Sequence, residues 1–164
     1  MKHLLLSAVL VFSLGACAIL IPTPPPAGAS EQEVIAKLGQ PTNRYTDGDQ
    51  RLLEYMTGPA GQTTYMARLD ASGRLVSYQQ VLTVQQFGKI EVDRATKSDV
   101  LRLIGAPSDT SYLTLTKREV WSYPYREQNV WDSMMHVQFD DAGVVRMLQN
   151  GPDPRRLPSD GGKM

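Results

Sequence analysis

The chain has 164 residues, with 17 basic and 17 acidic side chains, one cysteine and a hydrophobic content of 41%. This length suffices for one ordinary domain or for two small modules that share a core. The balanced charge argues against binding nucleic acid through a broad basic surface, and no run of Lys or Arg restores that possibility.

The N-terminus has the parts of an export signal. Lys2 supplies the positive charge, and an apolar run from Leu4 to Leu14 follows it. Small residues then lead to the only cysteine, in Leu14-Gly15-Ala16-Cys17. A charged start, about ten apolar residues and a small-residue cleavage site are typical of a secretory signal peptide. The run is shorter than the roughly 20 residues that span a bilayer, so a transmembrane anchor is not expected.

Leu14-Gly15-Ala16-Cys17 resembles the lipobox of bacterial lipoproteins. The resemblance implies that residues 1–16 are a signal peptide cleaved after Ala16 and that Cys17 carries a covalent lipid, the one modification we expect in place of a cofactor. Ala18 follows the cysteine in the place where aspartate would oppose sorting to the outer membrane. The implied location is the outer membrane of a Gram-negative bacterium, lipid-anchored and facing the periplasm. A secretory signal with an incidental cysteine is the alternative.

The rest of the chain divides by composition. Residues 17–28 are a proline-rich linker, which favours an extended, semi-rigid spacer. Residues 151–164 lack apolar periodicity and are predicted to be a disordered tail. Between them we predict two internal repeats, at residues 29–88 and 89–150.

Each repeat begins with a helix signature. Ala29 to Pro41 matches Ala95 to Pro107 position by position, at an offset of 66 residues. A Ser or Thr that can cap the helix is followed three residues later by an acid, as in a capping box. A glycine suited to a left-handed ending then precedes a proline that prevents continuation. These positions are Ser30, Glu33, Gly39 and Pro41 in the first copy and Thr96, Asp99, Gly105 and Pro107 in the second.

After each helix the apolar residues alternate, which indicates half-buried strands joined in hairpins. The expected strands are residues 43–46, 50–56, 63–69 and 75–82 in the first copy and 109–115, 120–125, 131–139 and 144–148 in the second. The predicted fold is therefore α+β: two tandem repeats of a short helix plus three or four antiparallel strands, with the helices packed on a sheet.

Four aromatic residues are the candidates for partner contact. Trp121, Tyr123 and Tyr125 alternate on one strand face, and Trp131 begins the next strand. One interpretation places them in the core under the helices, where Trp131 shares the core-facing phase of Met135, Val137 and Phe139. The other places them on an open sheet face as anchors for a protein, with Arg68 and His136 on the opposite phase.

Catalytic and metal-binding patterns are missing from the sequence. His136 is the only imidazole outside the signal, and its strand phase predicts a solvated residue. Asp47-Gly48-Asp49 has Arg51 where a calcium loop needs an oxygen ligand, so it is interpreted as a turn. Asp140 and Asp141 are interpreted as acids of a hairpin bend. We therefore predict that the protein is not an enzyme and binds no metal.

The second copy resembles the SmpA/OmlA (BamE-like) family of outer-membrane lipoproteins. The matching segments are Thr96 to Pro107, Glu119 to Tyr123 and Val137 to Gly143, and the first copy keeps Leu38 to Pro41 and Tyr55. The resemblance implies an accessory, non-catalytic interaction module, with the β-barrel assembly machinery as a possible partner. Two modules joined into one sheet also look like the β-lactamase-inhibitory-protein arrangement. The alternative function is accordingly an inhibitor or regulator that binds a periplasmic enzyme through its sheet.

Overall fold

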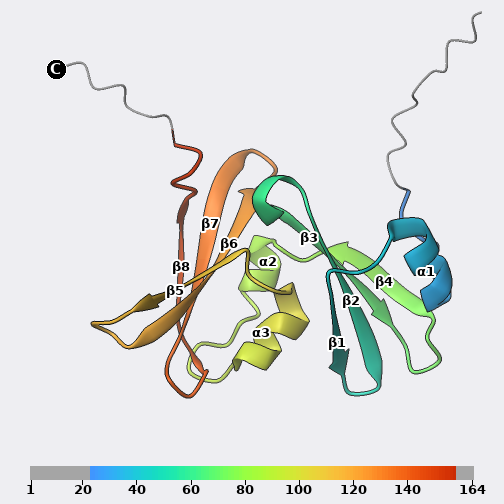
Figure 1. The fold of residues 1–164 in the computed structure, drawn as a ribbon, viewed down its shortest axis with the longest axis horizontal. Coiled ribbons are helices and arrows are strands. Elements are labelled where there is room, and N and C mark those ends of the chain that lie inside the picture. The colour runs from blue at the N-terminus through green and yellow to red at the C-terminus, as the bar shows by residue number, and fades with distance from the viewer. Residues whose placement is uncertain (1–22, 158–164) are drawn as a thin grey trace, which may run out of the picture.

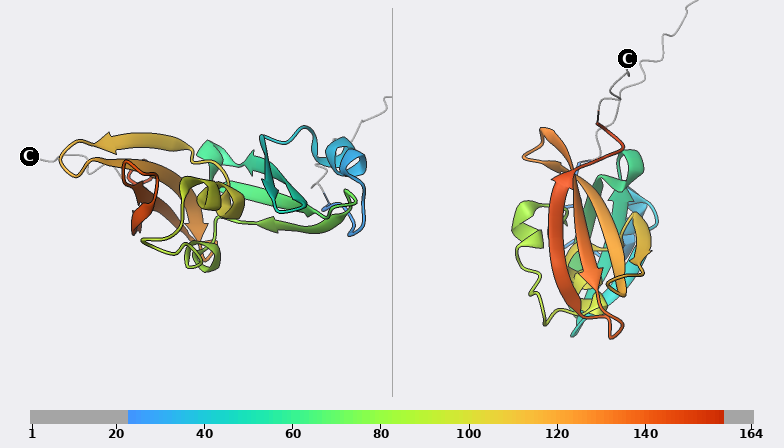
Figure 2. Two further views of the ribbon diagram at one scale, coloured as in Figure 1. Left: turned by 90° about the horizontal axis from the view of Figure 1, so that it is seen from below. Right: turned by 90° about the vertical axis from the view of Figure 1, so that its left-hand side faces the viewer.

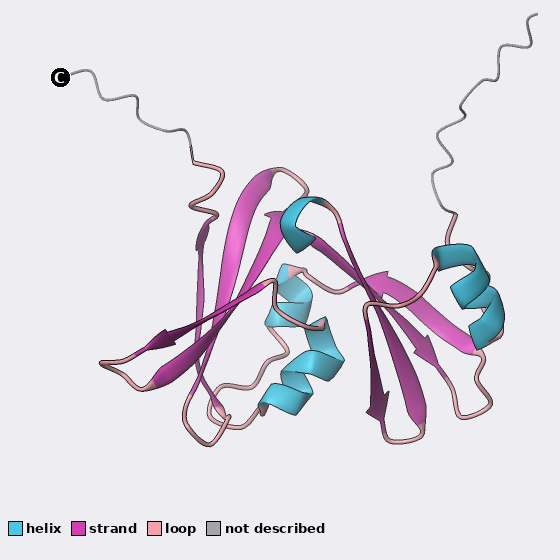
Figure 3. Cartoon of the chain, in the orientation of Figure 1, coloured by secondary structure: helices cyan, strands magenta, loops and turns pink. Residues whose placement is uncertain are grey.

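A computed structural model describes residues 23–157, and these residues form two antiparallel four-stranded sheets and several short helices (Figures 1 and 3). The first unit comprises α1 (Glu31–Leu38), β1 (Asn43–Asp47), β2 (Gln50–Thr57), the 3-10 turn η1 (Pro59–Gly61), β3 (Thr63–Leu69) and β4 (Leu75–Gln80). The second unit comprises α2 (Val84–Phe87), α3 (Lys97–Ile104), β5 (Asp109–Leu113), β6 (Arg118–Glu127), β7 (Trp131–Phe139) and β8 (Val145–Pro152). The predicted α+β class is confirmed.

The strands of each unit follow chain order, β1-β2-β3-β4 in one sheet and β5-β6-β7-β8 in the other. The expectation of one joined sheet is therefore wrong for the described chain. Helices α2 and α3 lie between the two sheets in Figure 1. The left view of Figure 2 also shows the two sheets at opposite ends of the molecule. Because α2 and α3 follow β4, the chain leaves the first sheet before it begins the second.

Both predicted helix starts are confirmed. Ser30 accepts a hydrogen bond from the backbone N–H of Glu33, whose carboxylate in turn accepts from the Ser30 backbone. Thr96 and Asp99 repeat this capping box at the start of α3. Both end glycines have positive φ, 86° at Gly39 and 83° at Gly105. Two short helices thus begin and end by the same local chemistry.

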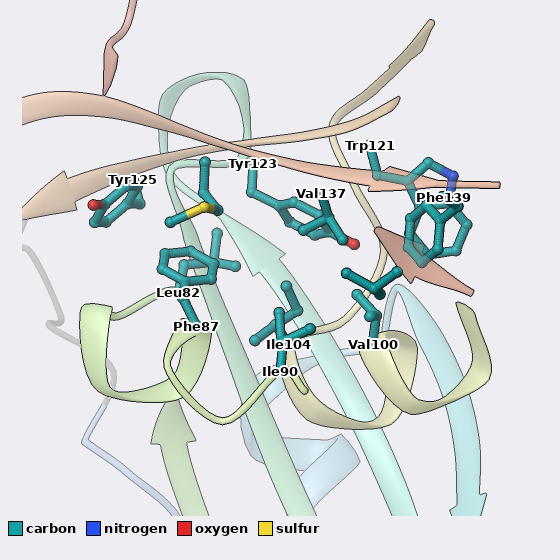
Figure 4. Close-up of a cluster of buried hydrophobic side chains, with 12 residues drawn as sticks. Leu82, Phe87, Ile90, Val100, Ile104, Trp121, Tyr123, Tyr125, Val137 and Phe139 are labelled. Atoms are coloured by element: carbon teal, nitrogen blue, oxygen red, sulfur yellow. The ribbon is translucent and has the colours of Figure 1, made fainter. Parts of the chain in front are cut away.

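Each unit has its own buried cluster. In the first, Val34 of α1 contacts a group from β2, β3 and β4 that includes Leu53, Ala67 and Leu69. In the second, Val100 and Ile104 of α3 join residues of β6 and β7 (Figure 4). Both helices are too short to be stable alone, so this burial is what stabilises them.

Helix α2 was not predicted, and its contacts assign the segment around it to the second unit. Phe87 packs edge-on against Tyr125, with ring centroids 4.9 Å apart. Leu82 and Ile90 belong to the same buried cluster of the second unit (Figure 4). The chain therefore passes to the second unit close to Val81, ahead of the boundary predicted between residues 88 and 89.

Helix α3 is covered on two sides. One side packs on the second sheet, while the other faces the strands of the first unit. There Arg68 of β3 donates to the backbone carbonyl of Arg102 at 3.1 Å, and Asp47 lies within 3.7 Å of the Arg102 guanidinium. The face of the first sheet that carries Arg68 is thus an internal contact between the two units and is not an open surface.

Glu54 of β2 lies at this junction with no exposed surface. One carboxylate oxygen accepts from the backbone N–H of Ala106, just past α3, at 3.1 Å. The other accepts from Asn43 Nδ2 at 2.9 Å and from the Tyr45 hydroxyl at 2.6 Å. Burial and the bond to Glu54 raise the pKa of Tyr45. A buried acid therefore connects β1, β2 and the end of α3.

The described chain is ordered beyond both predicted limits of the repeats. Pro25 is buried, and Gly28 donates to the Leu75 carbonyl at 2.8 Å, so the end of the proline-rich linker lies against the first unit. Strand β8 continues to Pro152, and the buried Asp153 pairs with Arg155 at 2.8 Å. The tail predicted to be disordered from residue 151 is therefore ordered as far as Leu157.

Candidate protein-interaction site

Three of the four aromatic candidates lie in the core. Trp121, Tyr123 and Tyr125 are at most 8% exposed and face helices α2 and α3 (Figure 4). The Tyr123 hydroxyl donates to the Gly105 carbonyl at 3.1 Å. Partner contact by these three residues is therefore corrected in favour of the core interpretation. The cause is the pair of helices, which covers the face that these residues share.

Trp131 behaves differently, since 66% of its surface is exposed. Its partner across the strands is Glu127, so it lies on the helix-covered side of the sheet but beyond the reach of α2. It therefore lies on the side that its phase predicted but is not part of the core. Val130 and Val84 are also exposed, by 59% and 50%. The exposed Trp131 stays a candidate for partner contact.

A groove of about 580 Å³ lies beside the start of the β6–β7 turn. One wall is formed by β3, β4 and the segment that follows β4. The other wall is the end of β6 and the turn after it. The lining residues are Thr63, Tyr65, Gln80, Leu82, Thr83, Val84, Gln85, Tyr125, Arg126, Glu127, Gln128 and Asn129. Both units therefore contribute to this groove.

A network of hydrogen bonds fixes one side of the groove. Tyr125 donates to Asn150 Oδ1 at 3.1 Å, and Asn150 Nδ2 donates to Glu127 at 3.3 Å. Ser133 Oγ also donates to Glu127, at 2.9 Å. The bonds from Ser133 and Asn150 lower the pKa of Glu127, while burial together with the Glu127 charge raises the pKa of Tyr125 to about 12. At neutral pH the network presents a fixed carboxylate and a neutral phenol, which suits recognition of polar groups.

The remaining titratable candidates have structural partners. Asp47 approaches Arg68 and Arg102, and Asp140 accepts from the Val144 backbone at 2.9 Å. His136 is only half-exposed, with its Nδ1 3.0 Å from Ser122 Oγ, and burial lowers its pKa. The prediction of a solvated histidine is corrected in this respect. Within residues 23–157, His, Cys, Asp and Glu nowhere gather in a group of three that could hold a metal.

Sequence reasoning missed the groove and the buried Glu54. The groove is formed by segments about 45 to 65 residues apart, which no local pattern could reveal. Glu54 lies in a segment of β2, Leu52 to Tyr55, in which all four residues are buried, so buried and exposed positions do not alternate there. A strand buried on both faces reads as a continuous apolar run. Leu52-Leu53-Glu54-Tyr55 is such a run except for its one acid, and this pattern was the sequence signal for Glu54.

The predicted cleavage and lipidation motif, Leu14, Gly15, Ala16 and Cys17, lies outside the described residues. In the described part, no helix is long and apolar enough to cross a membrane.

Comparisons with known proteins identify one family. Residues 79–149 match the family model of the outer membrane protein assembly factor BamE domain. No curated protein matches the chain. Among solved structures, a DUF4309 family protein (YjgB) from Bacillus subtilis is 14% identical over 76% of this chain and 79% of its own, with a TM-score of 0.33. The match begins at residue 79, close to the start of the second unit, and ends within β8. The second unit is therefore BamE-like, which confirms the resemblance to the BamE/SmpA-like family that its motifs predicted.

Proposed function

We propose that this protein is a non-catalytic, lipid-anchored protein of the outer membrane that faces the periplasm. It serves as an accessory protein-interaction module in outer-membrane protein assembly or envelope integrity. The observation that carries the proposal is the match of residues 79–149 to a domain of an outer membrane protein assembly factor. The N-terminal motif ending in Cys17 supports the anchor, and the tandem of two such modules remains part of the proposal.

The partner surface that we propose is the groove together with the exposed side chains at its end. Trp131 supplies the large, rigid apolar surface that interfaces favour as an anchor. The groove beside it offers Glu127 as a fixed hydrogen-bond acceptor. An apolar anchor next to a few fixed polar groups is the usual composition of a protein-binding site. A protein is therefore the expected partner.

The test is chemical cross-linking of the protein in its native envelope, followed by affinity purification and mass spectrometry. Recovery of the β-barrel assembly machinery supports the assembly role. Recovery of one periplasmic enzyme in its place supports the alternative, an inhibitor or regulator of that enzyme. Trp131→Ala should reduce recovery of the partner several-fold. The matched control is Val76→Ala on β4, because Val76 is also exposed, by 56%, but is not among the groove-lining residues.

The anchor has its own test. Cys17→Ser should abolish labelling by radioactive palmitate and should release the protein from the membrane fraction. If the variant stays in the membrane fraction at the wild-type level, Cys17 is not the anchor. The circular dichroism spectrum of the variant is the control for an unchanged fold.

A further inference from the structure

Strand β5 is an exposed edge. Within residues 23–157 it pairs only with β6, and all five of its residues are exposed. The hairpin that it forms with β6 extends to the end of the molecule farthest from α1 (Figures 1 and 2). Within β5 Tyr112 is 55% exposed, and Leu115 in the hairpin turn is 100% exposed. The backbone groups on the outer side of β5 are thus open to pairing with another strand.

Two of the other outer strands are covered at the start of their edges. Before α1, Gly28 and Ala29 exchange backbone hydrogen bonds with Leu75 of β4, each 2.8 Å long. Before α3, Asp93 donates to Val145 of β8 and Val145 donates to Ala95, again at 2.8 Å. The segment that precedes each helix therefore covers the first residue of the last strand of its own sheet.

The fourth outer strand, β1, is protected by charge. Arg44 pairs with Glu31 at 2.8 Å, and Asp47 approaches Arg68 and Arg102. Charged side chains on an edge oppose its pairing with another chain. Strand β5 has only Asp109, at its first position, and contains neither lysine nor proline. Among the four outer strands of the described chain, β5 is the one with neither a covering backbone bond nor a charged pair at its edge.

We propose that β5 pairs with β5 of a second copy of this chain, antiparallel and about a twofold axis at Ser111. A twofold axis requires a self-complementary surface. Centred on Ser111, it sets this small residue against itself and sets Thr110 against the partner's Tyr112. Asp109 then lies opposite the partner's Leu113. The β5–β8 sheet of one copy and the β5–β8 sheet of the other then form one continuous sheet.

The charged residues of β5 and β6 favour a second copy of this chain as the partner of β5. Leu113 pairs with Arg118 of β6 in the same copy, so the partner's Arg118 stands on the same face, one strand beyond the partner's Leu113. Strands are about 4.8 Å apart, so the two residues lie about 10 Å apart across two spacings. The Arg118 and Asp109 side chains bridge this distance together once Arg118 leaves its hydrogen bond to Gln138 of β7. The twofold axis makes this ion pair twice. The formal net charge of the chain is +0, so two copies do not repel each other strongly.

A five-residue pairing is small, so the dimer should be weak and dependent on concentration. The first experiment places a cysteine at the axis in the full chain, as Ser111→Cys. Opposed residues of antiparallel strands have Cα atoms about 4.5 to 5.5 Å apart, which a disulfide can bridge. We expect a cross-linked dimer under mild oxidation. Ser72→Cys, in the exposed β3–β4 turn, is the matched control for random collision, and the unmodified chain measures the contribution of Cys17.

The second experiment tests the ion pair by sedimentation velocity. Asp109→Arg and Arg118→Asp should each weaken the dimer several-fold, and the double variant should restore it, because the exchanged charges again meet across the axis. The proposal is overturned if Ser111→Cys forms no more dimer than Ser72→Cys. It is also overturned if the double variant associates no better than the single ones, or if β5 captures a strand of a different protein and the chain stays monomeric.

Discussion

Two glycines that hold the same place in the two units allow a matched test of the junction between them. Gly39 ends α1 with φ 86° and ψ −172°, and Gly105 ends α3 with φ 83° and ψ −169°. A Cβ atom on Gly39 would meet no described atom within 4 Å. A Cβ atom on Gly105 would lie 2.7 Å from Glu54 Oε1 and 2.8 Å from Glu54 Cδ. The backbone is alike, and the surroundings differ.

Alanine at either position brings the same backbone strain, about 1 to 3 kcal/mol. It also reduces the freedom of the unfolded chain equally at both sites, so this contribution cancels in the comparison. At Gly105 the Glu54 carboxylate must move as well. It has no exposed surface and accepts three hydrogen bonds, and hydrogen bonds to a charged group contribute about 1.5 to 3 kcal/mol each. Losing one or two of them makes Gly105→Ala worse than Gly39→Ala by about 2 to 5 kcal/mol.

The assay is equilibrium unfolding in urea, followed by circular dichroism, for the wild type and both variants. A loss at the upper end would remove much of the roughly 5 to 15 kcal/mol that stabilises an ordinary domain. The double variant Glu54→Ala, Gly105→Ala should lose less than the sum of its single variants, because the clash is gone. Equal losses for Gly39→Ala and Gly105→Ala would refute the contact between Glu54 and the end of α3.

Two further predictions concern buried polar groups. Tyr123→Phe should lower the free energy of unfolding by about 1 kcal/mol, because the lost hydroxyl donates to a backbone carbonyl. Tyr55→Phe should be neutral or stabilising, because the buried Tyr55 hydroxyl has no partner among the described residues. Urea unfolding measures both variants, and equal effects would contradict these hydrogen-bond assignments. Burial lowers the pKa of His136, so the folded state favours the neutral ring. Stability from this residue is present above the unfolded pKa of about 6.5 and is lost as the pH falls below it. His136→Gln should lose less stability than the wild type between pH 7 and pH 5, and parallel pH profiles would count against this.

The sequence predicts best what depends on neighbours in the chain. Capping boxes at Ser30 and Thr96 and the positive φ of Gly39 and Gly105 were predicted and are confirmed. The strands lie within a few residues of their predicted limits. These features need only a few consecutive residues, so a single sequence contains their whole physical cause.

Features that depend on which elements meet were not predictable in the same way. Alternation shows that Trp121 and Trp131 share one side of the sheet, but it does not show where the covering helix ends. The structure buries Trp121 among the residues of α3, whereas Trp131 lies outside the buried cluster and is exposed. The single joined sheet failed for a similar reason, since no local pattern indicates that α3 lies between the units. The groove, built from both units, could not be predicted either.

Helix α3 joins the two units because it packs against both of them. One side of the helix completes the second core, and the other lies against strands of the first unit, which anchor its end through Glu54. Without the first unit, that side of α3 and the strand face opposite it would be exposed to water. The proposed partner groove also takes one wall from each unit. The BamE-like second unit can therefore form this groove beside Trp131 only with the first unit in place.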